Sequence, residues 1–166
     1  VQFVVSVLDG GHDDRQITKV VVAGMGGSAL AAVTAKALLD QQLTIPFEVV
    51  RDYDLPTYVD GSTLVIASSY SGNTEETLSA LEQAKERGAQ VAVIAAGGKL
   101  IEAAEGGNLP RVQIPAGLQP RMAVLFNLKA LVVLLQNFGI VDGSLADEVT
   151  AAGEWLQAET AQWLPD

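Results

Sequence analysis

The sequence lacks cysteine altogether and has a single histidine among its 166 residues. Without cysteine there is no disulfide, no thiol nucleophile and no cysteine-ligated zinc, and this absence fits a reducing cytoplasm. The lone His12 lies in the polar stretch Gly-Gly-His-Asp-Asp, where a solvated loop residue is a simpler interpretation than a metal ligand or a base. We therefore expect no metal, no cofactor and a cytoplasmic location.

Basic residues are also scarce, because 10 Lys and Arg stand against 20 Asp and Glu and the formal net charge is −10. Nucleic-acid binding needs a basic face that displaces counterions from phosphates, so we do not expect it. One small phosphate is a different case, because a few backbone N–H groups and one arginine can hold it at contact distance. No apolar run approaches the about 20 residues of a membrane span, so we expect no membrane partner either.

What is present is an alternation of short apolar runs and longer amphipathic stretches. The chain has 166 residues, of which 49% are hydrophobic, and this is enough for one domain with a full core. The alternation is typical of β-α units around a parallel sheet, and the uniformly apolar runs indicate burial on both faces. We predict an α/β fold with strands at residues 19–23, 47–51, 63–68, 90–95 and 111–114, and helices at 28–40, 74–87, 99–105, 121–138 and 144–163.

The first turn of chemical interest is Gly-Met-Gly-Gly-Ser at residues 24–28, which follows a predicted strand and opens a predicted helix. Its backbone N–H groups are able to face an anion without Cβ atoms in the way. The turn is not a dinucleotide fingerprint, because Ala29 stands at the third glycine position and Arg51, not an acidic residue, ends the next strand. The residues alone leave ligand contact and simple tight packing equally open.

The second turn, Ser-Ser-Tyr-Ser-Gly-Asn-Thr at residues 68–74, gathers hydroxyl groups where the third predicted strand ends and a helix begins. Hydroxyls donate to phosphate oxygens, and a helix start adds free N–H donors and about half a positive charge. The alternative is an elaborate helix cap, with Asn73 or Thr74 capping and Glu75 and Glu76 favouring the positive helix end. We favour an anion site, because three hydroxyls and a glycine exceed what a cap requires.

The run Ser-Tyr-Ser-Gly-Asn-Thr-Glu-Glu-Thr resembles the signature of the sugar isomerase (SIS) domain family. Together with residues 24–28 and Pro120-Arg121, it resembles the amino-terminal domain of the bifunctional phosphoglucose/phosphomannose isomerase family, over almost the whole chain. The resemblance implies a three-layer α-β-α sandwich with a five-stranded parallel sheet in a flavodoxin-like order. It also implies one SIS domain over 1–166, with an amino-terminal segment at 1–17, a β-α core at 18–140 and a helix at 141–166 that leads to a second domain.

Transferred by position, the resemblance implies a cradle for the substrate phosphate, formed by Gly27, Ser28, Ser69, Ser71 and Thr74. It also implies that Arg121 stabilises the negative charge of an enediolate intermediate, a task that suits a fixed guanidinium. From the residues alone, Arg121 reads more simply as a solvated residue at a helix start. The implied reaction interconverts glucose 6-phosphate or mannose 6-phosphate with fructose 6-phosphate.

This isomerisation moves a proton between C1 and C2 of the sugar, so it needs a general base and a group that opens the ring. In the family these groups come from the second domain or the partner subunit, and Glu75 and Glu76 are simpler to interpret as helix-start residues. We therefore expect this chain alone to bind phosphosugars and to be inactive. We expect it to pair as a homodimer or with a second SIS domain, through an apolar face at 123–135 and the two late tryptophans. A phosphosugar-sensing regulatory module and the isomerase domain of a glucosamine-6-phosphate synthase-like enzyme stay open as alternatives.

Overall fold

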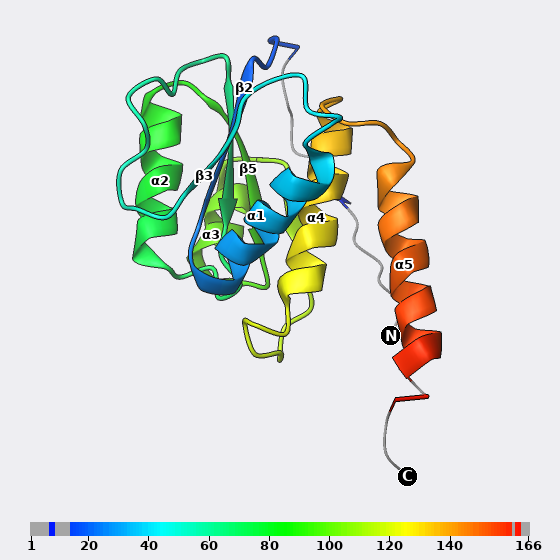
Figure 1. Cartoon of the computed structure of the whole chain (residues 1–166). Coiled ribbons are helices and arrows are strands. Elements are labelled where there is room, and N and C mark those ends of the chain that lie inside the picture. Colours follow the sequence, from blue (N-terminus) through cyan, green and yellow to red (C-terminus); the bar gives the residue numbers. More distant parts are fainter. Residues whose placement is uncertain (1–6, 9–13, 161, 164–166) are drawn as a thin grey trace.

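A computed structural model describes residues 7–8, 14–160 and 162–163, so His12 lies outside the described residues. Its centre is a sheet that helices flank (Figure 1). The strand order is β1-β6-β5-β4-β2-β3, and neighbouring strands run parallel except β1 and β6. The predicted five parallel strands are confirmed, and a two-residue antiparallel edge strand adds to them. The strands are β1 (Val7–Leu8), β2 (Lys19–Gly24), β3 (Phe47–Val50), β4 (Thr63–Ser68), β5 (Gln90–Ala95) and β6 (Arg111–Gln113).

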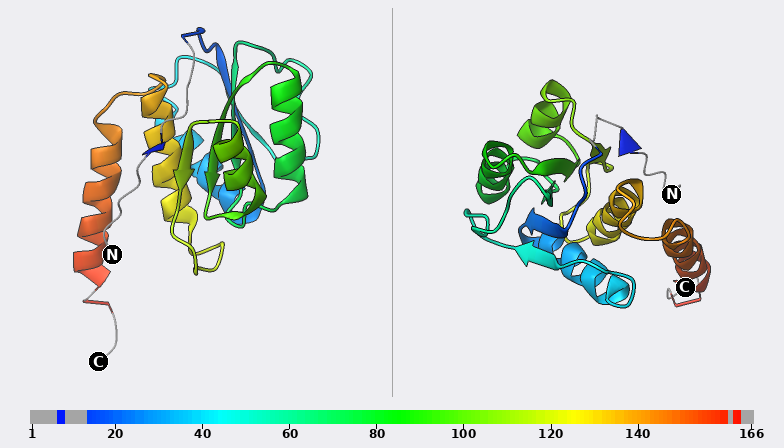
Figure 2. Two further views of the ribbon diagram at one scale, coloured as in Figure 1. Left: turned by 180° about the vertical axis from the view of Figure 1, so that it is seen from behind. Right: turned by 90° about the horizontal axis from the view of Figure 1, so that it is seen from above.

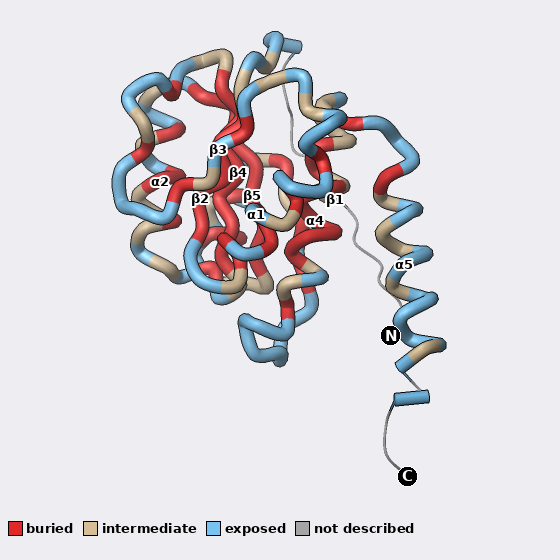
Figure 3. Tube along the Cα trace, viewed as in Figure 1, coloured by how far each residue is buried: buried red, intermediate tan, exposed pale blue. Residues whose placement is uncertain are grey.

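Helices cover both faces of this sheet and form the predicted three-layer sandwich (Figure 2). One apolar cluster joins the sheet to α1 and α4, and a second joins the other face to α2 and α3. The last helix, α5, packs beside α4 rather than on the sheet, and most of its residues are exposed (Figure 3). The helices are α1 (Gly26–Leu39), α2 (Glu75–Glu86), α3 (Gly98–Gly106), α4 (Val124–Asn137) and α5 (Leu145–Thr160).

The strands are apolar on both sides because each side faces helices. Successive side chains of a strand point to opposite faces. In β2, Val20 and Val22 belong to the cluster under α1 and α4, whereas Val21 and Ala23 belong to the cluster under α2 and α3. Every residue of β4 and β5 is buried. Burial on both faces explains the absence of a polar alternation in these runs.

The apolar stretch at 123–135 is used differently from what the sequence indicated. Most of it is buried within the chain, including Leu128, Leu131 and Leu135, because α4 packs between the sheet and its helical neighbours. Leu125 is the exception, with 52% of its surface exposed. Within this stretch, Leu125 is therefore the residue most open to a partner, and the pairing itself stays a prediction. The division into residues 1–17, 18–140 and 141–166 stays a prediction.

The order of the strands fixes where a ligand site belongs. Counted among the parallel strands in chain order, the sheet runs 2-1-3-4-5, which is the flavodoxin-like order. After β2 the chain turns outward through α1 to β3, and after β4 it turns the opposite way through α2 to β5. The carboxyl ends of β2 and β4 therefore form the topological switch point, where ligands bind in open α/β sheets.

The packing of α4 predicts unequal effects of two leucine substitutions on the same helix. Leu131 is 2% exposed, whereas Leu125 is 52% exposed. We expect Leu131→Ala to lower the free energy of unfolding by about 2–5 kcal/mol, because it leaves a cavity between the helix and the sheet. Leu125→Ala, the matched control, should change it by less than about 0.5 kcal/mol. Urea denaturation at neutral pH measures both, and equal losses would contradict this packing.

Candidate functional site

The two turns that the sequence singled out meet at the switch point. Gly24 ends β2 opposite Ser68, which ends β4. A Cβ atom on Gly24 would stand 2.8 Å from the carbonyl oxygen of Ser68 and 3.4 Å from the Cβ atom of Ser28. Glycine at this position thus lets the start of α1 approach the end of β4.

The start of α1 leaves backbone donors without a capping side chain. Met25 stands at the N-cap position and makes no side-chain cap bond, while its carbonyl accepts the N–H groups of Ser28 and Ala29 at 3.1 and 3.3 Å. Within the described part of the chain, the N–H groups of Gly26 and Gly27 make no hydrogen bond. No acidic residue lies in this first turn. The positive end of the α1 dipole is therefore open to an anion.

Three hydroxyls converge at the second turn. Ser69 Oγ lies 2.7 Å from Thr74 Oγ1 and 3.4 Å from Ser71 Oγ. Ser69 is buried, whereas Ser71 is exposed, so the cluster extends from the end of β4 towards solvent. Rotatable hydroxyls so placed can turn their protons towards a shared anion.

The side chains next to α2 do not cap that helix. Thr74 stands at its N-cap position but makes no side-chain cap bond, because its hydroxyl is paired with Ser69. The Asn73 side chain instead accepts the N–H of Lys99, at the start of α3, and donates to the carbonyl of Ser71. The interpretation of Asn73 or Thr74 as a cap of α2 is therefore wrong, and the first N–H groups of α2 stay without one.

Two glutamates lie beside this second helix start. The Tyr53 hydroxyl donates to Glu75 at 3.2 Å, and the pKa of Tyr53 is raised, first by the negative charge of Glu76 and then by the bond to Glu75. These negative carboxylates interact favourably with the positive end of the α2 dipole and partly cancel its positive potential. Of the two helix starts, α1 is accordingly the more positive.

The sequence placed Arg121 at the start of a helix. In the structure it lies instead in a turn before α4, which begins at Val124. The carbonyl of Gln119 accepts the N–H groups of Met122 and Ala123, so a tight turn precedes the helix and delays its start to Val124. Arg121 is exposed, and it makes no hydrogen bond or ion pair with another described residue.

The turn before α4 packs against the start of α1. A Cβ atom on Gly27 would stand 2.7 Å from the carbonyl oxygen of Pro120 and 3.6 Å from the Cα atom of Arg121. The structure therefore brings the backbone of Arg121 to the same edge of the sheet as the two turns. All six predicted site residues gather there, namely Gly27, Ser28, Ser69, Ser71, Thr74 and Arg121.

Two further residues at this edge have contacts that the sequence did not predict. Tyr70 reaches across to the loop after β6, where its hydroxyl donates to the carbonyl of Pro115 and accepts the N–H of Leu118. Asn127 is 1% exposed and bonds both Ser68 and the carbonyl of Ala123. A lone amide within the apolar stretch of α4 is the signal that would have indicated Asn127.

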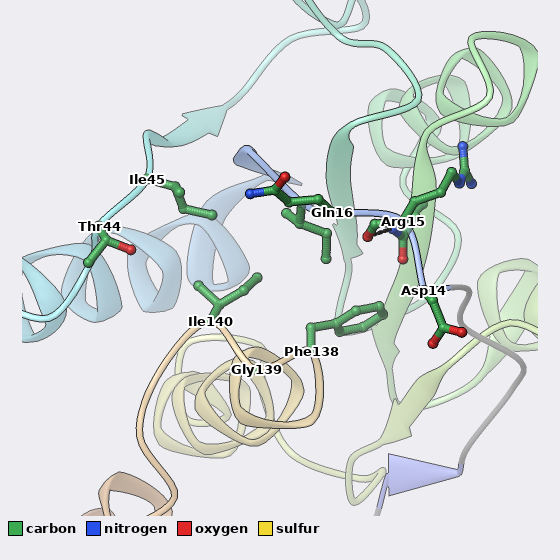
Figure 4. Close-up of a pocket in the computed structure, with 10 residues that line it drawn as sticks. Asp14, Arg15, Gln16, Thr44, Ile45, Phe138, Gly139 and Ile140 are labelled. Atoms are coloured by element: carbon green, nitrogen blue, oxygen red, sulfur yellow. Dashed lines mark hydrogen bonds between the residues drawn. The ribbon is translucent and has the colours of Figure 1, made fainter.

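A hollow of about 380 Å³ lies at the other edge of the sheet, near the amino ends of the strands (Figure 4). Thr44, Ile45, Phe138 and Ile140 surround it, and none of the predicted site residues lines it. The Arg15 guanidinium donates to the carbonyls of neighbouring loops rather than into this space. The hollow is therefore separate from the switch point.

Two other kinds of feature are absent from the part of the chain that the structure describes. No group of three or more His, Cys, Asp or Glu side chains among them could hold a metal ion. None of the described helices has the length and hydrophobicity that a membrane crossing requires.

The crowding at Gly72 predicts a strong effect of one methyl group. Gly72 has a φ of +69°, and a Cβ atom there would stand 1.8 Å from the carbonyl oxygen of Gly97. Gly88 has the same φ of +69° but open space around it, so it is a matched control. We expect Gly88→Ala to cost about 1–2 kcal/mol of unfolding free energy, through φ alone, and Gly72→Ala to cost clearly more. Thermal unfolding measures both, and equal costs would show that the 69–74 turn is not locked against Gly97.

Comparison with known proteins agrees with this arrangement. The family model of the SIS domain matches residues 15–105, which include both turns. A bifunctional phosphoglucose/phosphomannose isomerase from Caldicellulosiruptor bescii is 48% identical over 128 residues, which are 77% of this chain and 38% of that protein. A D-glucosamine-6-phosphate 4-epimerase from Sulfolobus acidocaldarius is 37% identical over 145 residues, covering 82% of this chain and 45% of that protein.

A solved structure supports the fold at low sequence identity. The C-terminal domain of glucosamine-fructose-6-phosphate aminotransferase from Francisella tularensis has a TM-score of 0.66 and 20% identity, covering 86% of this chain and 43% of that chain. The present chain spans less than half the length of the curated relatives described above. Because the family model matches more than half of its residues, the chain belongs to the SIS domain family.

Proposed function

We propose that this chain is the phosphosugar-binding part of an aldose-ketose isomerase that interconverts glucose 6-phosphate or mannose 6-phosphate with fructose 6-phosphate. One observation carries the proposal: α1 and α2 both begin without side-chain caps at the carboxyl ends of neighbouring strands, and three hydroxyls converge beside them. The isomerase from Caldicellulosiruptor bescii, at 48% identity, supports the choice of substrate.

The proposed phosphate site uses both turns at once. Ser69, Ser71 and Thr74 donate hydroxyl protons to the phosphate oxygens, while the start of α1 supplies the N–H of Gly27 and the hydroxyl of Ser28. Support comes from Ser28, which is 5% exposed and makes no side-chain hydrogen bond with another described residue. Donors from two helix starts favour a dianion in spite of the acidic net charge, because they act at contact distance.

Arg121 is proposed to stabilise the enediolate that forms when a proton leaves the sugar carbon. Its backbone lies beside Gly27, so a sugar whose phosphate sits in the cradle extends towards the Arg121 turn. A guanidinium stays charged at every physiological pH and offers a planar set of donors to two neighbouring oxygens. A cation fixed where negative charge develops lowers the barrier of the reaction.

The general base and the ring-opening group are proposed to come from a second domain or a partner subunit. Glu75 already accepts a hydrogen bond from Tyr53 and lies with Glu76 on the first turn of α2, where both carboxylates serve the helix end. The chain spans 38% of the isomerase from Caldicellulosiruptor bescii. By itself it is proposed to bind substrate without turnover, in the cytoplasm.

The proposed pairing, with a second copy or a second SIS domain, would use the side of α1, α4 and α5. An apolar hollow of about 380 Å³ lies there between the three helices. Leu38 and Leu156 line this hollow and are 57% and 39% exposed, and Trp155, next to Leu156 in α5, is 60% exposed. Apolar surface of this kind is typical of protein interfaces.

The same cradle would serve other phosphosugar proteins. A sensing module needs only the phosphate site, and the aminotransferase and the epimerase described above share the fold or part of the sequence. The higher identity to an isomerase favours isomerisation over these alternatives.

Titration with glucose 6-phosphate tests the proposal. We expect amide NMR shifts confined to residues 26–28 and 69–74, and Ser71→Ala should weaken binding by about tenfold, because it removes a bond to a charged group. Ser62→Ala, at the other end of β4, is the control and should leave the affinity unchanged. Absence of shifts at millimolar ligand would refute the site. Formation of fructose 6-phosphate by the chain alone, in a coupled assay, would show that the base lies within it.

A further inference from the structure

We infer that Tyr70 is a positioning residue, whose hydroxyl fixes the loop that carries Arg121 next to the turn at residues 68–74, here called the phosphate turn. The inference rests on the proposed function, which gives Arg121 a substrate to face. Tyr70 lies between Ser69 and Ser71 in the sequence, yet its hydroxyl makes its bonds in the loop between β6 and α4. One short turn therefore supplies both the phosphate hydroxyls and the support of the arginine loop.

The contacts of Tyr70 are specific on both sides. Its hydroxyl donates to the carbonyl oxygen of Pro115 at 3.2 Å and accepts the N–H of Leu118 at 2.7 Å. A phenol can donate one hydrogen bond and accept another, so both capacities are used. The ring packs against the apolar cluster under α1 and α4, and the Tyr70 carbonyl accepts the N–H of Ala96 at 3.0 Å. The packing of the ring and the backbone bond to Ala96 thus fix the position of Tyr70 independently of the loop.

The loop itself has little else to hold it. All residues at 115–122 are exposed, so their side chains bury little apolar surface. Segments with few buried contacts depend on polar contacts for a fixed conformation. Leu118 stands three positions before Arg121, and Pro120 lies against Gly27. The contacts at Tyr70 and Gly27 therefore set where the Arg121 backbone lies.

A second contact fixes the other side of Arg121. Ala123 is fully buried, and its carbonyl accepts the side-chain amide of Asn127, whose oxygen accepts the Ser68 hydroxyl at 3.5 Å. Arg121 is thus bracketed by two polar contacts that start from Ser68 and Tyr70 of the phosphate turn. Only the Tyr70 contacts can be removed without disturbing the core, because Tyr70→Phe keeps the ring and loses the hydroxyl.

Two ligands separate the roles of the phosphate site and of Arg121. Inorganic phosphate reports on the cradle, whereas 5-phospho-D-arabinonate adds a carboxylate that imitates the charge of an enediolate. We expect Tyr70→Phe to weaken binding of the arabinonate by about tenfold and to leave phosphate binding unchanged, because two hydrogen bonds that orient Arg121 are lost. The double variant with Arg121→Ala should bind the arabinonate no more weakly than Arg121→Ala alone.

The matched control is Tyr58→Phe, which removes a tyrosine hydroxyl bonded to Glu48, away from the switch point, and should leave both affinities unchanged. The inference is overturned if Tyr70→Phe binds the arabinonate like the unaltered chain. It is overturned as well if the double variant binds the arabinonate more weakly than Arg121→Ala by the same factor that Tyr70→Phe alone loses. It is also overturned if Tyr70→Phe weakens both ligands equally, since Tyr70 would then support only the cradle.

A measurement without ligand separates this inference from the proposed function. Failure of the unaltered chain to bind either ligand would refute the proposed function. Hydrogen exchange of the Leu118 amide then still reports on the loop, because its N–H donates to the Tyr70 hydroxyl. Exchange that accelerates at least tenfold in Tyr70→Phe supports the fixed loop, and unchanged exchange contradicts it.

Discussion

The parallel pairing of β2 with β4 is the constraint on which the rest of the site depends. It places Gly24 beside Ser68. The segments that follow β2 and β4 then leave the sheet on opposite faces, through α1 and α2. Two helix starts are thereby brought to one edge, each with backbone donors that the helix itself cannot satisfy. Because helices bury the sheet on both sides, the carboxyl ends of β2 and β4 hold the starts of α1 and α2 in fixed positions. A phosphate is a natural ligand for such an edge, because it accepts from many donors at once.

Uncapped helix starts cost stability, and the chain accepts that cost at two neighbouring positions. A side-chain cap typically contributes about 1 kcal/mol. Thr74 stands at the capping position of α2, but its hydroxyl pairs with Ser69, and the Asn73 side chain supports α3 instead. Gly72 allows this local geometry, because any side chain there would collide with Gly97. The first backbone N–H groups of α1 and α2 are thereby left without a side-chain partner, which is consistent with a ligand that accepts hydrogen bonds from them.

The fold was predictable because buried strands and amphipathic helices leave local patterns, as in the uniformly apolar run of β4. The hydroxyl turn was predictable for the same reason, since its residues are consecutive. Contacts between distant residues left no such pattern: Tyr70 meets Pro115 and Leu118, which are 45 and 48 positions away. The start of α4 was misplaced because a turn centred on the Gln119 carbonyl replaced the first helical turn. Tertiary packing, rather than local preference, decided both.

A crystal structure of the chain with glucose 6-phosphate would show directly where the phosphate binds. We expect the phosphorus atom between the first turns of α1 and α2, with phosphate oxygens within hydrogen-bonding distance of the Ser69, Ser71 and Thr74 hydroxyls and of the Gly27 N–H. The sugar should extend towards Arg121. A phosphate bound elsewhere, such as in the hollow beside Thr44 at the opposite edge of the sheet, or no bound sugar at saturating concentration, would contradict this expectation.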